Sequence, residues 1–165
     1  MKLKNHMPVK SQPVPEVWEH SKGADQYEKS HRLPSAGLHK KILVVDDEVY
    51  YMELLKMTLE DTGRFEVALV SDGTRVLEVA RDFEPDLILL DIVMPGVDGG
   101  DIAAQLRLDR KLGKVPVIFV TALVSASEST QGESVVRRGG RCMLSKPVHS
   151  KVLIETIDAA IRGRL

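Results

Sequence analysis

Residues 87–99 of the chain read LILLDIVMPGVDG. Four apolar residues, Leu87 to Leu90, lead directly into an acid, Asp91, and a Met-Pro-Gly loop and a second acid, Asp98, follow. An apolar run without alternating polar residues is typical of a strand that is buried on both faces of a parallel sheet. The stretch therefore predicts a buried strand that ends in a carboxylate at the edge of a sheet.

Apolar runs and amphipathic stretches alternate from Lys40 to the end of the chain. Five strand–helix units in succession predict an α/β fold, in which helices cover both faces of a parallel sheet. We expect strands at about 41–46, 65–70, 87–91, 115–121 and 142–145. We expect helices that contain 52–59, 76–83, 102–106, 126–138 and 152–161, the third of them ending near Gly113.

Composition limits the classes of protein to which the chain can belong. Its 165 residues suit one domain with a core, and its formal net charge of −1 gives no basic field for nucleic acid. No apolar run is long enough to span a membrane or to form a signal peptide. The only cysteine, Cys142, excludes an intramolecular disulfide, which suits a reducing compartment. We therefore expect a cytoplasmic protein that binds neither nucleic acid nor membrane.

The first 39 residues differ in composition from the rest of the chain. They contain four of the eight prolines and four of the five histidines, with few aliphatic residues. Such a segment buries too little apolar surface to offset the entropy of ordering it, so we expect a flexible arm at 1–39 and a folded domain at 40–165. A short docking motif around Val17 and Trp18 is the alternative for the arm.

Polar residues follow the predicted strands at one edge of the sheet. The carboxyl ends of parallel strands share an edge, where open α/β sheets bind ligands. The residues are Asp46 and Asp47 after the first strand, Asp91 after the third, Thr121 after the fourth and Lys146 after the fifth. Crowded carboxylates repel, and hard oxygen ligands with room for water suit Mg²⁺. With an ammonium and a hydroxyl nearby, this cluster could stabilise a transferring phosphoryl group, and Asp91 could be its acceptor.

Each of these residues has a simpler explanation when it is taken alone. A single acid at a strand end is more often a helix cap, and Asp46 or Asp47 could cap the first helix. Thr121 could be a loop hydroxyl and Lys146 a solvated side chain. The specific signal is the set of five residues on successive strand ends, with matched chemistry.

The set resembles the receiver domain of two-component response regulators, in a stand-alone form like the chemotaxis regulators. The resemblance covers about 40–165 and is carried by VVDD, LLDIVMPGVDG, VIFVTA and SKP, at 44–47, 89–99, 117–122 and 145–147. It implies a flavodoxin-like, doubly wound, five-stranded parallel sheet of order 2-1-3-4-5. It also implies that a sensor histidine kinase or a histidine phosphotransfer protein donates a phosphoryl group to Asp91.

The resemblance assigns roles to the other site residues. Asp46 and Asp47 would position Mg²⁺, completed by Asp91 and the backbone carbonyl of Val93. Lys146 and Thr121 would bind phosphoryl oxygens, and the peptide bond between Lys146 and Pro147 would be cis. Phosphorylation would then change the surface of the fourth helix, fifth strand and fifth helix, which an unknown output partner would bind.

Three features depart from the family pattern or refine it. Met143 stands where the family usually has an aromatic switch residue, so aromatic switching is in doubt. Arg137, Arg138 and Arg141 form a small basic cluster, either a solvated face or a site for an acidic partner. Val93 and Leu123 lie two residues beyond Asp91 and Thr121, and their apolar side chains cannot orient a hydrolytic water. We therefore expect slow autodephosphorylation.

Other classes of protein fit the sequence less well. A haloacid dehalogenase-like phosphatase also uses an aspartyl-phosphate, but Asp46, Asp47 and Glu48 lack its D-x-D-x-T spacing. A dinucleotide-binding domain needs G-x-G-x-x-G after a strand, which is missing. A pseudo-receiver would have lost some of the five site residues. Only Gly163-Arg164-Leu165 follows the last helix, so we expect output through a protein contact, a phosphoryl relay or a separate domain.

Overall fold

The apolar runs of the sequence form the strands of one central sheet. The computed structural model describes residues 39–123 and 135–164. Its strands are β1 (Lys40–Val45), β2 (Phe65–Val70), β3 (Leu87–Leu90), β6 (Val117–Thr121), β7 (Val135–Arg138) and β8 (Arg141–Ser145). All four residues of β3 and the last four of β1 are buried, which explains why these runs contain no alternating polar positions.

The strand order is β2-β1-β3-β6-β8-β7. The first five strands are parallel and follow the predicted order 2-1-3-4-5, which confirms the doubly wound fold. The sixth strand, β7, pairs antiparallel with β8 at the edge. The sheet therefore has one strand more than the five predicted.

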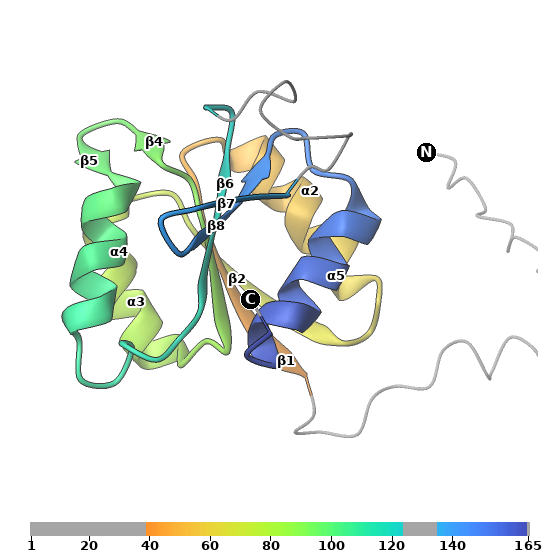
Figure 1. The fold of residues 1–165 in the computed structure, drawn as a ribbon, viewed down its shortest axis with the longest axis horizontal. Coiled ribbons are helices and arrows are strands. Elements are labelled where there is room, and N and C mark those ends of the chain that lie inside the picture. Colours follow the sequence, from red (N-terminus) through yellow and green to blue (C-terminus); the bar gives the residue numbers. More distant parts are fainter. Residues whose placement is uncertain (1–38, 124–134, 165) are drawn as a thin grey trace, which may run out of the picture. The chain divides into compact units, whose positions relative to one another are not determined.

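Helices cover both faces of this sheet, as predicted. Figure 1 shows α2 (Val49–Glu60) and α5 (Ser150–Ile161) on one face, and α3 (Val76–Phe83) and α4 (Gly99–Leu108) on the other. A short 3₁₀ helix, η1 (Gly73–Arg75), precedes α3. The two faces bury separate apolar clusters, one built around Leu59, Leu89 and Ile157 and the other around Val76, Ile88 and Ile102.

Local signals explain where the helices end. Glu84 follows α3 with a φ of 53° and precedes Pro85, which cannot continue the helix. The predicted end of the third helix near Gly113 is wrong, because α4 ends at Leu108. The Asp109 carboxylate accepts hydrogen bonds from the amides of Lys111 (2.8 Å) and Leu112 (3.1 Å), which replace the helical pattern after Leu108.

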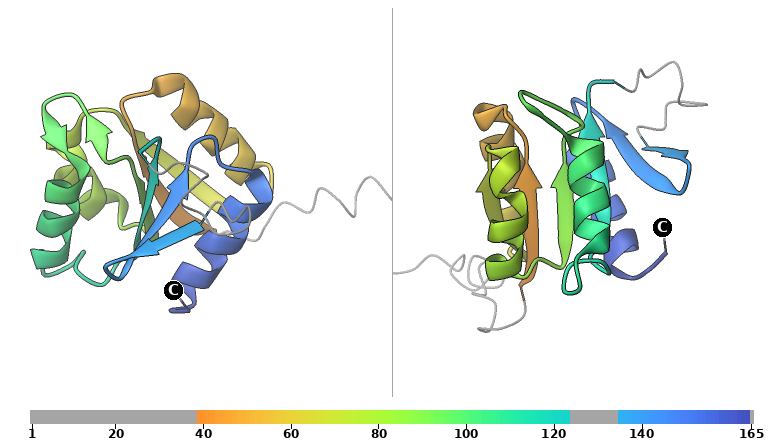
Figure 2. Two further views of the ribbon diagram at one scale, coloured as in Figure 1. Left: turned by 45° about the horizontal axis from the view of Figure 1, so that its top comes forward. Right: turned by 90° about the vertical axis from the view of Figure 1, so that its left-hand side faces the viewer.

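The helix predicted at 126–138 is wrong where the structure describes it. Residues 126–133 and Ser134 lie outside the described residues, but Val135–Arg138 is the strand β7, seen beside β8 in both views of Figure 2. A tight hairpin turn explains the difference. Gly139 and Gly140, with φ of 58° and 74°, join Arg138 to its partner Arg141, and only glycine adopts such a turn without strain.

The structure bears only in part on the expected arm and on the expected absence of a membrane span. The arm expected at 1–39 lies outside the described residues except for His39. Among the helices of the described residues, none is long and apolar enough to cross a membrane.

Candidate functional site

Backbone hydrogen bonds hold three of the predicted site residues at the carboxyl edge of the sheet. Each bond lies one step beyond the last residue of a strand, so that the parallel pairing continues into the site. The bonds run from the amides of Asp46, Asp91 and Lys146 to the carbonyls of Val70, Val45 and Thr121, at 3.2, 2.9 and 3.0 Å. These side chains are therefore positioned by the sheet itself rather than by a loop.

Three carboxylates meet one ammonium at this edge. The Lys146 Nζ lies 2.7 Å from Asp46 Oδ2, 2.8 Å from Asp91 Oδ2 and 2.9 Å from Glu48 Oε1. Carboxylate oxygens of the three acids lie within 4.8 Å of one another. Asp46 and Asp91 are buried, with exposed fractions of 2% and 6%, whereas Glu48 is exposed. Three negative charges against one positive charge leave two that are uncompensated.

The electrostatics of the cluster follow from this imbalance. Two like charges about 4 Å apart repel by roughly 4 kcal/mol at an effective dielectric constant of 20. Burial raises the pKa of Asp46 above its ordinary value, although its bond to Lys146 opposes this shift. Burial disfavours the charged Lys146, but its hydrogen bonds to the three carboxylates outweigh that effect and raise its pKa. The lysine therefore stays charged, and the acids retain an affinity for a further cation.

Both oxygens of the Asp91 carboxylate are engaged. Oδ1 accepts hydrogen bonds from the amides of Ile92 (2.6 Å) and Val93 (3.3 Å), while Oδ2 accepts the bond from Lys146. Amides on one side and an ammonium on the other fix the orientation of the group. The arrangement directs hydrogen-bond donors at a buried carboxylate at the edge of the sheet.

The remaining predicted residues surround this carboxylate. Thr121 is fully buried, and its hydroxyl accepts a weak hydrogen bond from the amide of Leu123 (3.3 Å). Val93 and Leu123 are 56% and 64% exposed, and their backbone amides bond the Asp91 carboxylate and the Thr121 hydroxyl. The peptide bond between Lys146 and Pro147 is cis, as the resemblance implies.

Met143 is half-buried in β8, against the apolar cluster of α3 and α4. It pairs with Phe119 of β6 on one side and with Val136 of β7 on the other.

Tyr51 of α2 contacts the lysine of the site. The Lys146 ammonium sits 4.9 Å from the centroid of the Tyr51 ring, and the Tyr51 hydroxyl accepts a long hydrogen bond from the Val148 amide (3.4 Å). Tyr51 of α2 is not among the residues that the sequence predicts.

The structure groups the acids differently from the sequence prediction. Asp47 is exposed and lies outside the group of three carboxylates, whereas Glu48 belongs to it. The Asp46 carboxylate accepts a hydrogen bond from the Glu48 amide (2.9 Å), which turns the chain so that Glu48 faces Lys146. This local turn, common after aspartate, is the only signal in the sequence that could have indicated Glu48.

The loop after Asp91 is a short hairpin that connects the end of β3 to α4. β4 (Val93–Met94) pairs antiparallel with β5 (Val97–Asp98) around Gly96, which has a φ of 79°. Asp98 then caps α4 by accepting a hydrogen bond from the Gly100 amide. Gly99 packs so closely that an added Cβ would lie 2.0 Å from the backbone oxygen of Asp91.

The comparisons with known proteins give the class to which this fold and site belong. Residues 42–158 match the family model described as "Response regulator receiver domain". The chain belongs to this family, and it is a receiver domain that serves as a phosphoacceptor in two-component signalling. No support remains for the phosphatase alternative.

Individual relatives point in the same direction. The chain is 37% identical over 123 residues to the protein PilH of Pseudomonas aeruginosa, covering 74% of this chain and 98% of PilH. It is 34% identical over 125 residues to the DNA-binding response regulator MtrA of Mycobacterium leprae, covering 76% of this chain and 52% of MtrA. The chain thus spans about half the length of the MtrA proteins that it matches.

Solved structures share the fold. The chemotaxis protein CheY4 of Vibrio cholerae superposes with a TM-score of 0.62 at 26% identity, covering 74% of this chain and 98% of CheY4. A receiver domain from a Francisella response regulator gives a TM-score of 0.61 at 26% identity, covering 77% of this chain and all of that domain.

Replacing Gly99 with alanine tests how tightly the start of α4 packs against the backbone at the end of β3. Because the new Cβ would overlap the Asp91 backbone, we expect a loss of about 2 kcal/mol or more in the free energy of unfolding, measured with urea. We also expect altered amide chemical shifts at Asp91 and Ile92.

Gly63→Ala is the matched control for this change. Gly63 has a φ of 65° and open space where a Cβ would lie, so alanine there should cost about 1 kcal/mol through its backbone conformation alone. The amides of Asp91 and Ile92 should not shift. Equal shifts in the two variants would contradict the close packing at Gly99.

Proposed function

We propose that Asp91 is the phosphoacceptor of this receiver domain, and that a sensor histidine kinase or a histidine phosphotransfer protein is the donor. The observation that carries the proposal is the position of Asp91, a buried carboxylate at the end of the central strand β3 that contacts the ammonium of Lys146. An Asp91 oxygen attacks phosphorus, the bond to the donor imidazole breaks, and the imidazole keeps the electron pair. The product is an aspartyl-phosphate.

Two residues near Asp91 could stabilise the transferred group in this proposal. The Lys146 ammonium can move from the carboxylate to a phosphoryl oxygen without leaving the site. Thr121 can donate its hydroxyl proton to another phosphoryl oxygen. Among the described residues, this hydroxyl makes one hydrogen bond, in which it accepts from the Leu123 amide, so its proton is available. Fixed donors at the developing negative charge lower the barrier to phosphoryl transfer.

The chemistry of the cluster fits a Mg²⁺ ion. Hard carboxylate oxygens that carry two uncompensated charges match the ligands that Mg²⁺ prefers. We assign Asp46, Asp47, Asp91 and the Val93 carbonyl as its ligands, with Glu48 as a further partner of Lys146. When bound, the ion neutralises charge on the phosphoryl group during transfer.

The output surface differs from the one that the family resemblance implies. β8 and α5 are present as predicted, but Val135–Arg138 is a strand rather than part of a fourth helix. We therefore propose that the phosphorylation signal reaches a protein partner through β7, β8 and α5. Met143 in the middle of β8 can repack between Phe119 and Val136, although it cannot act as an aromatic switch.

Labelling with acetyl phosphate tests the acceptor. We expect Mg²⁺-dependent phosphorylation of the wild-type chain and none of Asp91→Asn, measured as an 80 Da gain by intact-mass spectrometry. Asp98→Asn is the matched control, because asparagine also caps a helix and should leave labelling unchanged. Labelling that persists in Asp91→Asn, or is lost in Asp98→Asn, would show that the acceptor is assigned wrongly.

A comparison of two neighbouring acids tests the metal ligands. Since we assign Asp47 to the ion and Glu48 to Lys146, Asp47→Asn should weaken Mg²⁺ binding about tenfold or more, and Glu48→Gln should weaken it less. Isothermal titration of the unphosphorylated chain gives both affinities. A larger effect of Glu48→Gln would transfer the ligand role to Glu48.

We further propose slow autodephosphorylation, because the residues two positions beyond Asp91 and Thr121 are the apolar Val93 and Leu123, which cannot orient a hydrolytic water. Val93→Asn should accelerate decay of the phosphorylated form, since an amide at this exposed position can orient a hydrolytic water. The readout is loss of label after acetyl phosphate is removed. Leu108→Asn, at a position of α4 that is 86% exposed, should leave the decay unchanged. An unaltered rate in Val93→Asn rejects this explanation of the lifetime.

A further inference from the structure

Two hollows adjoin each other at the amino-terminal end of the sheet, opposite the carboxylate cluster. One has a volume of about 540 Å³ and lies between β6, β8 and the end of α5. The other has a volume of about 380 Å³ and lies between β6 and α4. Both are lined by Val117, Gly140 and Arg141, so they form one groove beneath the turn between β7 and β8.

The floor of this groove is apolar. Two strands and two helices contribute aliphatic and aromatic side chains to it, and each hollow has its own set. The main contributors are Ile118, Ala160 and Ile161 in the larger hollow, and Leu106, Val115 and Phe119 in the smaller one. Each hollow can therefore take an apolar side chain of a ligand.

The rim of the groove is cationic. Arg107, Lys114, Arg137 and Arg141 line the two hollows, and no acidic side chain among the described residues lines either one. Within residues 39–123 and 135–164, none of these four side chains takes part in an ion pair. Arg141 stands between the hollows, with its guanidinium 5.7 Å from the centroid of the Phe119 ring.

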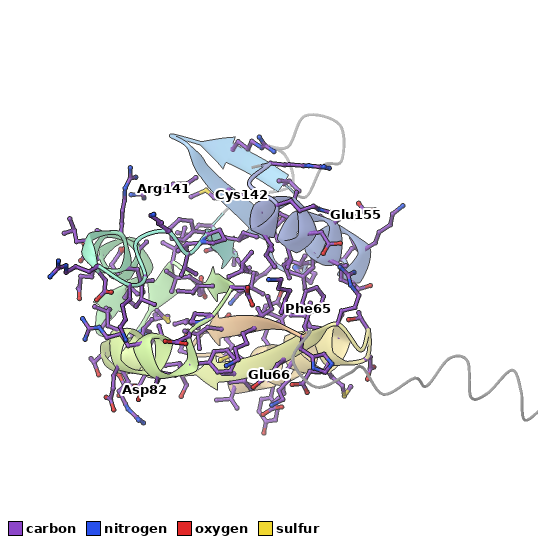
Figure 3. The ribbon with its side chains drawn as sticks, turned by 90° about the horizontal axis from the view of Figure 1, so that it is seen from below. Phe65, Glu66, Asp82, Arg141, Cys142 and Glu155 are labelled. Carbon is purple, nitrogen blue, oxygen red and sulfur yellow. The ribbon has the colours of Figure 1, made fainter. Side chains whose placement is uncertain are left out.

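Figure 3 looks onto this end of the sheet and labels Arg141 and Cys142 at the start of β8. The chain as a whole carries a formal charge of −1, so the four cations are a local feature rather than part of a basic surface field. The carboxylates of Asp46, Glu48 and Asp91 gather at the opposite edge of the sheet. An acidic ligand is therefore attracted to the groove and repelled from the carboxylate cluster.

We propose that this groove binds an acidic segment of a partner protein, in which apolar side chains alternate with carboxylates. The apolar side chains fill the two hollows, and the carboxylates pair with the four cations of the rim. Two hollows on either side of Arg141 suit an extended chain better than one compact small molecule. The two apolar hollows favour a peptide with apolar side chains over nucleic acid, whose phosphodiester backbone would contact only the cationic rim.

The groove shares β7, β8 and α5 with the proposed output surface, but binding to the unphosphorylated chain does not require the phosphoacceptor role of Asp91. The groove lies at the amino ends of β6 and β8, and the site lies at the carboxyl ends of the strands. Asp91→Asn should therefore leave binding of the acidic segment to the unphosphorylated chain unchanged. The two proposals can fail separately.

The test is a titration of the ¹⁵N-labelled full chain with a short synthetic peptide in which Glu alternates with Leu and Phe. We expect amide chemical shifts to move at Val117, Gly140 and Arg141, with affinity that falls as salt is added. Arg141→Glu and Arg137→Glu, at exposed positions, should each weaken binding about tenfold. A peptide with Gln in place of Glu should bind the wild-type chain at least as weakly as the Glu-containing peptide binds these two variants.

Arg75→Glu is the matched control. It makes the same change in charge on an exposed arginine of η1, which follows the carboxyl end of β2. It should alter the affinity by less than about twofold. The proposal is overturned by the absence of shifts at peptide concentrations on the order of 1 mM, or by equal losses in Arg75→Glu and Arg141→Glu. Shifts at the groove with duplex DNA or anionic vesicles, but not with the peptide, would also overturn it.

Discussion

The contact of the Lys146 ammonium with three carboxylates is the interaction on which the functional edge of the molecule depends. Parallel pairing places Asp46 and Asp91 side by side at the ends of β1 and β3, where neither can retreat into solvent. Without a nearby cation their repulsion would oppose the pairing of the two central strands. The lysine therefore links β8, two strands away, to the alignment of β1 and β3.

One ammonium is not enough for three acids, and the remaining charge can be used in a reaction. A site that was fully neutralised by its own residues would have little affinity for an added ion. A site with no lysine would have no donor for the oxygens of an anionic group. Because of this imbalance, the same few side chains can bind both a metal ion and a phosphoryl group. The positive metal ion offsets the excess carboxylate charge, and the Lys146 ammonium offsets the negative charge of the phosphoryl group.

The sequence predicts the sheet and most of the site because both depend on regular patterns. The runs of Leu87–Leu90 and Ile118–Val120 are buried, so their apolar character is continuous and their ends are sharp. Asp91 and Thr121 follow these runs directly, and the parallel topology brings the strand ends to one edge.

Features that depend on local geometry are harder to predict. Glu48 reaches Lys146 because the Asp46 side chain turns the backbone between them, and no periodic pattern records that turn. β7 is missed because its four residues are too few to show alternation, although the Gly-Gly pair that follows is a strong hairpin signal. Tyr51 lies on α2 at a helical spacing that suits a core position, and only the fold brings its ring near the ammonium.

The strand order also determines which site residues can come into contact first during synthesis of the chain. β1, β2 and β3 are neighbours in the sheet and are complete by Leu90, whereas Lys146 comes more than fifty residues later. On a ribosome, where amino-terminal segments emerge first, the acids of β1 and β3 are available before the ammonium that holds them. When β6 and β8 then join the sheet, they bring the Lys146 ammonium to the carboxylates of Asp46 and Asp91. The last parallel strand therefore stabilises the carboxyl edge formed by the first strands.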